Sequence, residues 1–145
     1  MGEEWTFEHT VECSVSKEFA WNFWTNVSNW TLDADIISVQ LEGPFAVGVT
    51  GVTQTKSSGR IEWRVAELQP GRAVLEFPAP GALARFVFTF EDVEGRTRIR
   101  QQVGLAGEEA SAYVETVGRA LQTGIPAGMR KLCKAMEAAA RMPAD

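Results

Sequence analysis

Between residues 36 and 105, apolar and polar side chains alternate in a series of short segments, and one long helical segment follows them. Alternation with a period of two is typical of strands that bury one face. Short turn sequences separate the segments, such as PGR at 70–72, PAPGA at 78–82 and VEGR at 93–96, where Gly95 can supply a positive φ. Six strands in series with such turns predict an antiparallel meander.

The first 35 residues predict one more strand and one or two short helices. Residues 5–13 alternate, and one parity is apolar except for a histidine: Trp5, Phe7, His9, Val11 and Cys13. Ser16 is a suitable N-cap for a helix with Glu18 in its first turn. The stripe of that helix is Ala20, Phe23, Trp24 and Val27. Residues 26–35 are polar and broken, which fits a short second helix or a loop.

Residues 108–141 predict a long helix, with acidic residues at its start and basic residues near its end. Its expected apolar stripe consists of Tyr113, Val117, Leu121, Gly124, Leu132, Met136 and Ala139. The segment GIPAG at 124–128 interrupts this pattern, and we expect Pro126 to kink the helix or bend its approach. No linker, repeat or low-complexity run divides the chain, so residues 1–145 are expected to form one domain.

The predicted class is therefore α+β, with a seven-stranded antiparallel sheet, two short helices between its first two strands, and a long C-terminal helix. A sheet with one apolar face must cover that face. A twisted sheet of seven strands is wider than one helix, whose diameter is roughly 10–12 Å. The sheet must curl around the helix or leave space beside it, and large aromatic side chains would partly fill that space.

Composition and motifs argue against several classes of function. The net charge of −5 and the dispersed basic residues disfavour nucleic-acid binding. No apolar run approaches the ~20 residues that span a bilayer, and the acidic start lacks the apolar region of a secretory signal, so we expect no stable membrane insertion. Cys13 and Cys133 lie 120 residues apart without a CxxC pair, which argues against a metal site. Because no export signal is present, they are interpreted as reduced thiols in a cytoplasmic protein. A single histidine and the absence of nucleophile or phosphate-binding motifs indicate no metal site and no cofactor.

Three segments resemble a known superfamily. VSKEFAWNFWTNVSNW at 15–30 is similar to its opening helix, with one Trp after the first turn and a second shortly after the helix. LEGPFAVGVTGVTQT at 41–55 has its paired glycines, and VAELQPGRAVLEF at 65–77 resembles a hairpin of its polyketide cyclase and dehydrase branch. In order and spacing the chain resembles the SRPBCC superfamily (START, Bet v 1 and polyketide cyclase proteins). It departs from the family at Asn26, where Asp is common.

The resemblance implies a helix-grip fold, in which the sheet curls around the long helix. It also implies a cavity between sheet and helix that receives hydrophobic ligands. The superfamily includes lipid and sterol carriers, hormone receptors and aromatase/cyclases, so it implies binding more firmly than catalysis.

Candidate ligand-binding residues are those that the strand parity or the helical stripe turns inward: Phe7, His9, Trp63, Phe77, Phe88, Gln101, Tyr113 and Val117. Trp63 is the best single candidate for the pocket wall. Gln101 needs hydrogen-bond partners if it is buried, and protein, water or a ligand could supply them. His9 is either a core or sheet-edge imidazole or a pocket acid/base, because imidazole titrates near neutrality. Asp33 and Asp35 are interpreted as a solvated loop.

Three functions remain open at this point. The first is binding of a small hydrophobic or aromatic molecule, lipid or polyketide-like, between the sheet and the long helix. The second is a polyketide cyclase or dehydratase that uses the same cavity, with His9 as acid/base and Tyr113 as donor; whether the protein is an enzyme stays undecided. The third is an interaction domain with an exposed apolar patch. The protein is expected to be a monomer or a homodimer, and the sequence does not name the ligand.

Overall fold

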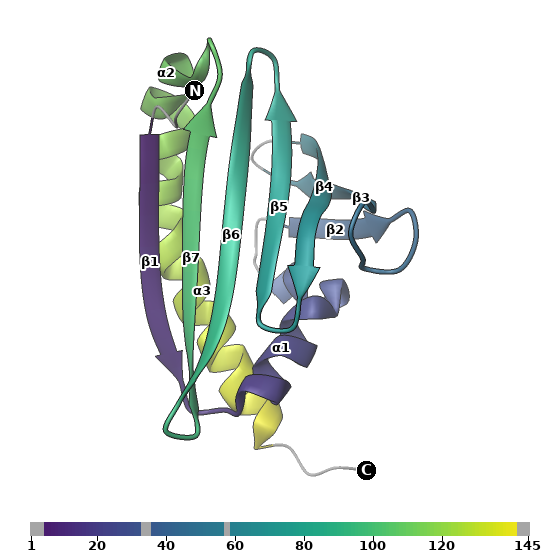
Figure 1. Ribbon diagram of the computed structural model, residues 1–145, viewed down its shortest axis with the longest axis vertical. Helices are drawn as coiled ribbons and strands as arrows, with labels where there is room; N and C mark the ends of the chain where they lie inside the picture. Colours follow the sequence, from purple (N-terminus) through teal and green to yellow (C-terminus); the bar gives the residue numbers. More distant parts are fainter. Residues whose placement is uncertain (1–4, 33–35, 57–58, 142–145) are drawn as a thin grey trace.

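The computed structural model describes residues 5–32, 36–56 and 59–141. Its strands form one seven-stranded antiparallel sheet in the order β1-β7-β6-β5-β4-β3-β2, with a long helix along the β1–β7 side (Figure 1). The strands are β1 (Trp5–Cys13), β2 (Ile36–Leu41), β3 (Thr50–Thr55), β4 (Gly59–Gln69), β5 (Arg72–Ala79), β6 (Ala82–Val93) and β7 (Arg96–Ala106). The helical elements are α1 (Lys17–Thr25), η1 (Val27–Leu32), α2 (Ala110–Tyr113), η2 (Val114–Gly118) and α3 (Arg119–Ala140). The predicted α+β class and the meander are confirmed.

The helical segment between β1 and β2 follows its sequence closely. Ser16 caps α1, because its Oγ accepts a hydrogen bond from the Phe19 backbone N–H at 3.1 Å. Asn26 ends that helix, and its Oδ1 accepts a hydrogen bond from the Ser28 hydroxyl at 2.7 Å. The same oxygen accepts a hydrogen bond from the Ser28 backbone N–H at 3.3 Å, so Asn26 caps the start of η1, at a position where the superfamily often has Asp. The segment 27–32 is a short 3₁₀-helix, one of the two predicted alternatives, and the predicted loop at Asp33 and Asp35 lies outside the described residues.

Of two turns of the meander, one is as the sequence predicts and one is tighter. The β6–β7 hairpin turns through Glu94 and Gly95, which both have positive φ, at 53° and 84°. Two such residues form the type of turn whose twist matches that of the strands, so the predicted role of Gly95 is confirmed. The expected loop at 78–82 is shorter than predicted, because β5 continues to Ala79, β6 starts at Ala82, and these two residues pair.

The C-terminal helical segment runs for 31 residues, from 110 to 140. It stays helical through Pro126, and its irregular turn is the π-helical η2. The expected kink at Pro126 stays a prediction. At this turn Gly118 packs on Trp5, where a Cβ would come within 3.3 Å of the indole. A π turn adds a residue and shifts the helix face that meets the sheet. Consequently Val117, expected to face inward, is 38% exposed.

Downstream of η2, the helix buries a stripe that differs from the predicted one. The buried residues of α3 are Ile125, Met129, Cys133 and Met136. They pack with the inner side chains of β1 and β7 and with α1 in a single core. The helix approaches β1, α1 and η1 most closely, so it lies along one side of the sheet rather than across its centre.

The two cysteines form a disulfide, which contradicts the expectation of reduced thiols. Cys13 ends β1 and Cys133 lies in the second half of α3, and their Cα atoms are 5.4 Å apart. The sequence separation of 120 residues hid this proximity, since it arises only when α3 packs along β1. The bond links the first strand to the last helix.

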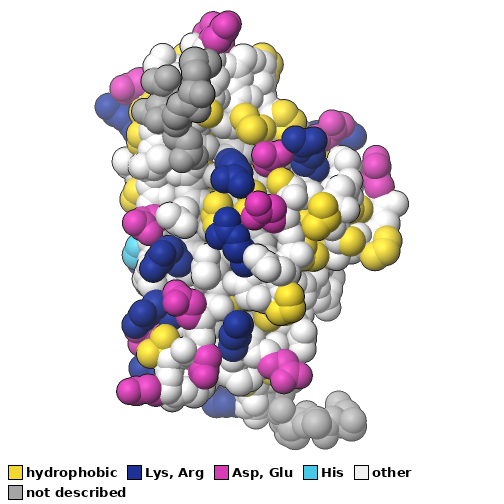
Figure 2. Space-filling model, in the orientation of Figure 1, with side chains coloured by type: hydrophobic (Ala, Val, Ile, Leu, Met, Phe, Trp, Pro, Cys, Tyr) yellow, Lys and Arg dark blue, Asp and Glu magenta, His cyan; other side chains and the backbone are white. Residues whose placement is uncertain are grey.

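The outer face of the sheet is charged. Figure 2, which looks at the face away from α3, shows acidic and basic side chains interspersed over it. Glu12 on β1 pairs with Arg96 and Arg98 on β7 at 3.6 and 3.2 Å, and Arg64 pairs with Glu76 across β4 and β5 at 2.6 Å. Such exposed pairs contribute little individually, roughly 0.2–1 kcal/mol. In the described part of the chain, no helix is long and apolar enough to cross a membrane.

Candidate functional site

Six aromatic rings on and beside the inner face of the sheet form a closed circuit of ring contacts. α1 and η1 contribute Trp24 and Trp30, and the sheet contributes the other four. In order around the circuit, the centroid distances are Trp24–Phe88 4.7 Å, Phe88–Phe86 6.4 Å, Phe86–Phe77 5.0 Å, Phe77–Trp63 6.1 Å, Trp63–Trp30 5.2 Å and Trp30–Trp24 5.5 Å. We call these six residues the aromatic circuit. All six separations lie in the range in which aromatic pairs attract one another.

The aromatic circuit is buried on one side and accessible on the other. Trp24 and Trp63 are only 4% and 1% exposed. The other four members, Trp30, Phe77, Phe86 and Phe88, are half-buried, although three of them point to the inner face of the sheet. Because α3 runs along β1, it leaves these rings of the central strands incompletely covered. The inner face therefore presents accessible aromatic surface.

The position of Trp63 is fixed by two neighbours on β3. Its indole Nε1–H donates a buried hydrogen bond to the Thr53 hydroxyl at 2.8 Å. Its ring lies against Gly51, which pairs with Trp63 across the strands. A hydrogen bond and a glycine without a side chain thus hold the indole flat against the neighbouring strand.

Two half-buried polar side chains lie beside the aromatic circuit, and they are neighbours. Gln101 on β7 pairs in register with His9 on β1 and with Phe88 on β6. Gln101 and His9 are both half-buried. Neither side chain has a hydrogen bond to any residue that the structure describes. An amide and an imidazole without protein partners thus lie beside the aromatic circuit.

The inner face has no charged group in this region. The β1 positions from Trp5 to Val11 that point inward, and their partners across β7, β6 and β5, include no Asp, Glu, Lys or Arg. The carboxylates of β1 pair instead with arginines of β7 on the outer face, Glu8 with Arg100 at 3.7 Å among them. The described residues also contain no group of three or more His, Cys, Asp or Glu side chains suited to a metal ion.

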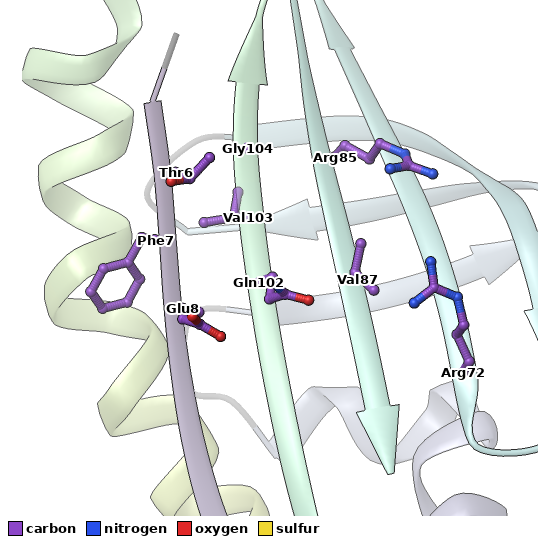
Figure 3. Close-up of a pocket in the computed structure, with 9 residues that line it drawn as sticks. All are labelled: Thr6, Phe7, Glu8, Arg72, Arg85, Val87, Gln102, Val103 and Gly104. Atoms are coloured by element: carbon purple, nitrogen blue, oxygen red, sulfur yellow. The ribbon is translucent and has the colours of Figure 1, made fainter. Parts of the chain in front are cut away.

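A hollow of about 540 Å³ lies on the outer face, and it is charged. Figure 3 shows Phe7 pointing from β1 toward α3, while Arg72 and Arg85 extend from β5 and β6. Both arginines are within ion-pair distance of Glu67, at 3.4 and 4.0 Å. The other lining residues are Thr6, Glu8, Val87, Gln102, Val103 and Gly104. This hollow is separate from the aromatic circuit, on the opposite side of the sheet.

A second hollow, of about 390 Å³, adjoins the aromatic circuit and has no charged lining residue. Its walls come from α1, the β2–β3 loop and the β4–β5 turn: Trp21, Thr25, Phe45, Leu68, Gln69 and Pro70. Phe45 lies 5.9 Å from Trp24 and 6.2 Å from Trp30, and Trp21 lies 5.7 Å from Trp24. The lining residues Trp21 and Phe45 therefore separate this hollow from Trp24 and Trp30, the two indoles that α1 and η1 contribute to the aromatic circuit.

The predicted site residues are only partly brought together. Trp63, Phe77 and Phe88 belong to the aromatic circuit, and Gln101 and His9 lie in the row that contains Phe88. Phe7 points toward α3 and stacks on Trp5, with centroids 6.3 Å apart.

Two predicted site residues, Tyr113 and Val117, lie at the start of the C-terminal helical segment and away from the aromatic circuit. The Tyr113 hydroxyl donates to the Pro80 backbone carbonyl at 3.0 Å, which ties α2 to the β5–β6 turn. Val117 is exposed.

Sequence reasoning placed Trp24 in the apolar stripe of the first helix and assigned none of Trp24, Trp30 and Phe86 to the site. The spacing of Trp24 and Trp30 could have indicated that these two indoles lie together. An indole six residues after a helical position can reach back, and Trp30 Nε1 does donate to the Trp24 carbonyl at 2.8 Å. Trp24 and Trp30 therefore hold α1 and η1 together and also form part of the aromatic circuit.

The comparisons with known proteins agree on the fold. The sequence matches no protein-family model, and no curated protein matches it. Among solved structures, Ara h 8.0201 superposes with a TM-score of 0.77 at 11% identity, over 92% of this chain and 98% of that one. A hypothetical protein from Helicobacter pylori gives 0.74 at 16% identity, over 92% and 89%.

Norcoclaurine synthase from Thalictrum flavum, solved in complex with dopamine and hydroxybenzaldehyde, is also similar. Its TM-score is 0.73 at 10% identity, over 97% of this chain and 89% of that one. At such identities the likeness concerns the fold. The chain has the helix-grip fold of the Bet v 1-like SRPBCC proteins.

Proposed function

We propose that this protein binds a small hydrophobic or aromatic molecule between the inner face of its sheet and the C-terminal helix. The observation that carries the proposal is the aromatic circuit, in which four of six rings, on and beside the inner face of the sheet, stay half-buried. Apolar surface left accessible to water gains about 25 cal/mol per Å² when a ligand covers it, before the costs of association. A ligand lying on Phe77, Phe86 and Phe88 would complete their burial.

Gln101 and His9 would orient such a ligand. Their side chains lie next to each other and beside Phe88, and they have no hydrogen bond within the described chain. A few polar groups in a mostly apolar site commonly fix the orientation of a ligand. Norcoclaurine synthase supports the idea that this fold can hold small aromatic molecules, since it was solved with two of them.

The alternative is an enzyme of the polyketide cyclase or dehydratase type. It would need His9 as acid/base and Tyr113 as a donor in the same cavity. The Tyr113 hydroxyl already donates to the Pro80 carbonyl, which favours the binding hypothesis over this one. The interaction-domain hypothesis rests on exposed apolar residues, and the large ones among the described residues are Ile37, Val47 and Val117, on β2, the β2–β3 loop and η2.

The cytoplasmic location stays a prediction, and the disulfide between Cys13 and Cys133 differs from the reduced thiols expected with it. Alkylation of thiols in freshly lysed cells tests it, because reduced cysteines would be modified. The predicted monomer or homodimer is tested by light scattering during size-exclusion chromatography.

Binding is tested with N-phenyl-1-naphthylamine, an uncharged probe whose fluorescence rises in apolar surroundings. We expect saturable binding of one probe per chain. Phe88→Ala should weaken it about tenfold, in line with loss of a large aromatic contact. Val87→Ala is the matched control, because Val87 is the next residue on β6 and lines the outer hollow. Absence of saturable binding, or an equal effect of the two substitutions, would contradict the proposal.

A further inference from the structure

We infer that the ligand is an uncharged, flat aromatic molecule with one hydrogen-bonding oxygen, and that Gln101 determines this specificity. The inference rests on the proposed function and narrows it, since it separates aromatic ligands from lipids with ionised head groups. Three independent features of the site support it: the distribution of charge, the shape of the wall, and the one unpaired amide.

The distribution of charge argues against an ionised ligand. In the rows around the aromatic circuit the inner face has no Asp, Glu, Lys or Arg, and the buried residues of α3 are all uncharged. The seven arginines of the sheet that form ion pairs do so with glutamates of its strands. A carboxylate drawn into the site would lose its hydration without meeting a cation, which is strongly unfavourable. The second hollow, beside Trp24, also has no charged lining residue.

The shape of the wall favours a flat ligand. Trp63 is held by its hydrogen bond to Thr53 and by close contact with Gly51, and Trp24 is buried among five other rings. Aromatic side chains have only two rotatable bonds, so rings packed in this way change shape little. A rigid aromatic wall suits a planar ring system, which can lie against these rings.

The unpaired amide selects an oxygen on the ligand. Gln101 offers an N–H donor and a carbonyl acceptor, so it can pair with a phenol or with a ketone. Its register neighbours are His9 and Phe88, so a ring stacked near Phe88 brings its substituent within reach of the amide. A neutral amide does not compensate a full negative charge. Gln101 therefore acts as a specificity determinant for neutral oxygen groups.

A set of matched ligands tests the inference by displacement of N-phenyl-1-naphthylamine at neutral pH. We expect 2-naphthol to bind, and 2-naphthoate and dodecanoate to bind at least about tenfold more weakly, because both are ionised. Gln101→Leu should weaken the binding of 2-naphthol about fivefold or more and leave the binding of 2-methylnaphthalene unchanged, since only the naphthol loses a hydrogen bond. Gln102→Leu is the control, because Gln102 is the adjacent residue and lines the outer hollow.

The outcomes separate this inference from the function on which it rests. If neither the probe nor any ligand binds, the proposed function is wrong. If the probe binds but 2-naphthoate or dodecanoate equals 2-naphthol, the function stands and the inference is overturned. If Gln101→Leu and Gln102→Leu behave alike, or if Gln101→Leu weakens 2-methylnaphthalene equally, the role of Gln101 is overturned.

Discussion

The indole of Trp63 lies so close to Gly51 that a Cβ added to this glycine would come within 2.3 Å of the ring carbon Cζ2. The two residues pair across β3 and β4, and the glycine leaves the space that the indole occupies. Since Trp63 is a member of the aromatic circuit, this contact positions part of the proposed ligand wall.

Gly51→Ala should destabilise the protein by about 1–3 kcal/mol, because the new methyl group must displace a buried indole. Gly124→Ala is the control: nothing lies within 4 Å of a Cβ at this position in α3. Replacing an exposed helical glycine by alanine should stabilise by about 0.5–1 kcal/mol. Urea denaturation followed by circular dichroism measures both. Equal stability of Gly51→Ala and the wild type would contradict the described packing of Trp63.

Thr53→Val should cost about 1–3 kcal/mol, because it keeps the side-chain volume but leaves the buried Trp63 Nε1–H without its acceptor. Thr53→Ser retains the hydroxyl and should recover part of this loss. Thermal unfolding provides the comparison, and the indole emission should change in the valine variant. A valine variant as stable as the serine variant would show that this hydrogen bond is unimportant.

Cys133→Ser should lower the free energy of unfolding by about 2–4 kcal/mol, because the disulfide to Cys13 closes a long loop in the unfolded chain. A strong reductant should bring the wild type to a similar stability and leave Cys133→Ser unaffected. Denaturant curves with and without reductant measure this. Alkylation of both cysteines in the unfolded protein without prior reduction would show that the bond is absent.

Tyr113→Phe should loosen the start of the C-terminal helical segment, since it removes the hydrogen bond to the Pro80 carbonyl. The free energy of unfolding should fall by at most about 1.5 kcal/mol, because the hydrogen bond is exposed. Hydrogen exchange should accelerate in residues 110–118, while binding of N-phenyl-1-naphthylamine should stay the same. Loss of binding with unchanged exchange would instead place the tyrosine at the ligand, as the enzyme hypothesis requires.

Local patterns predicted the elements well, because strand alternation and the Ser16 cap depend on neighbours in the sequence. They failed where distant segments meet. The disulfide depends on α3 lying along β1, and the exposure of Val117 depends on a π turn that no residue type announces. For the site, parity placed Trp63, Phe88 and Gln101 on the inner face. The circuit itself depends on Trp24 and Trp30, which reach the sheet only through the packing of α1 and η1.

The strand order also sets when the chain can fold during synthesis. Of the seven strands of this sheet, β1 is made first, yet its partner is β7, which is made last, and β2 lies at the opposite edge of the sheet. A ribosome must therefore complete residue 106 before β1 finds a neighbour, and the rings of Trp5 and Phe7 stay uncovered until then. Pairing between such remote segments is slow and leaves apolar surface exposed for longer. β1 therefore waits unpaired until the last hairpin of the sheet, β6–β7, has been made.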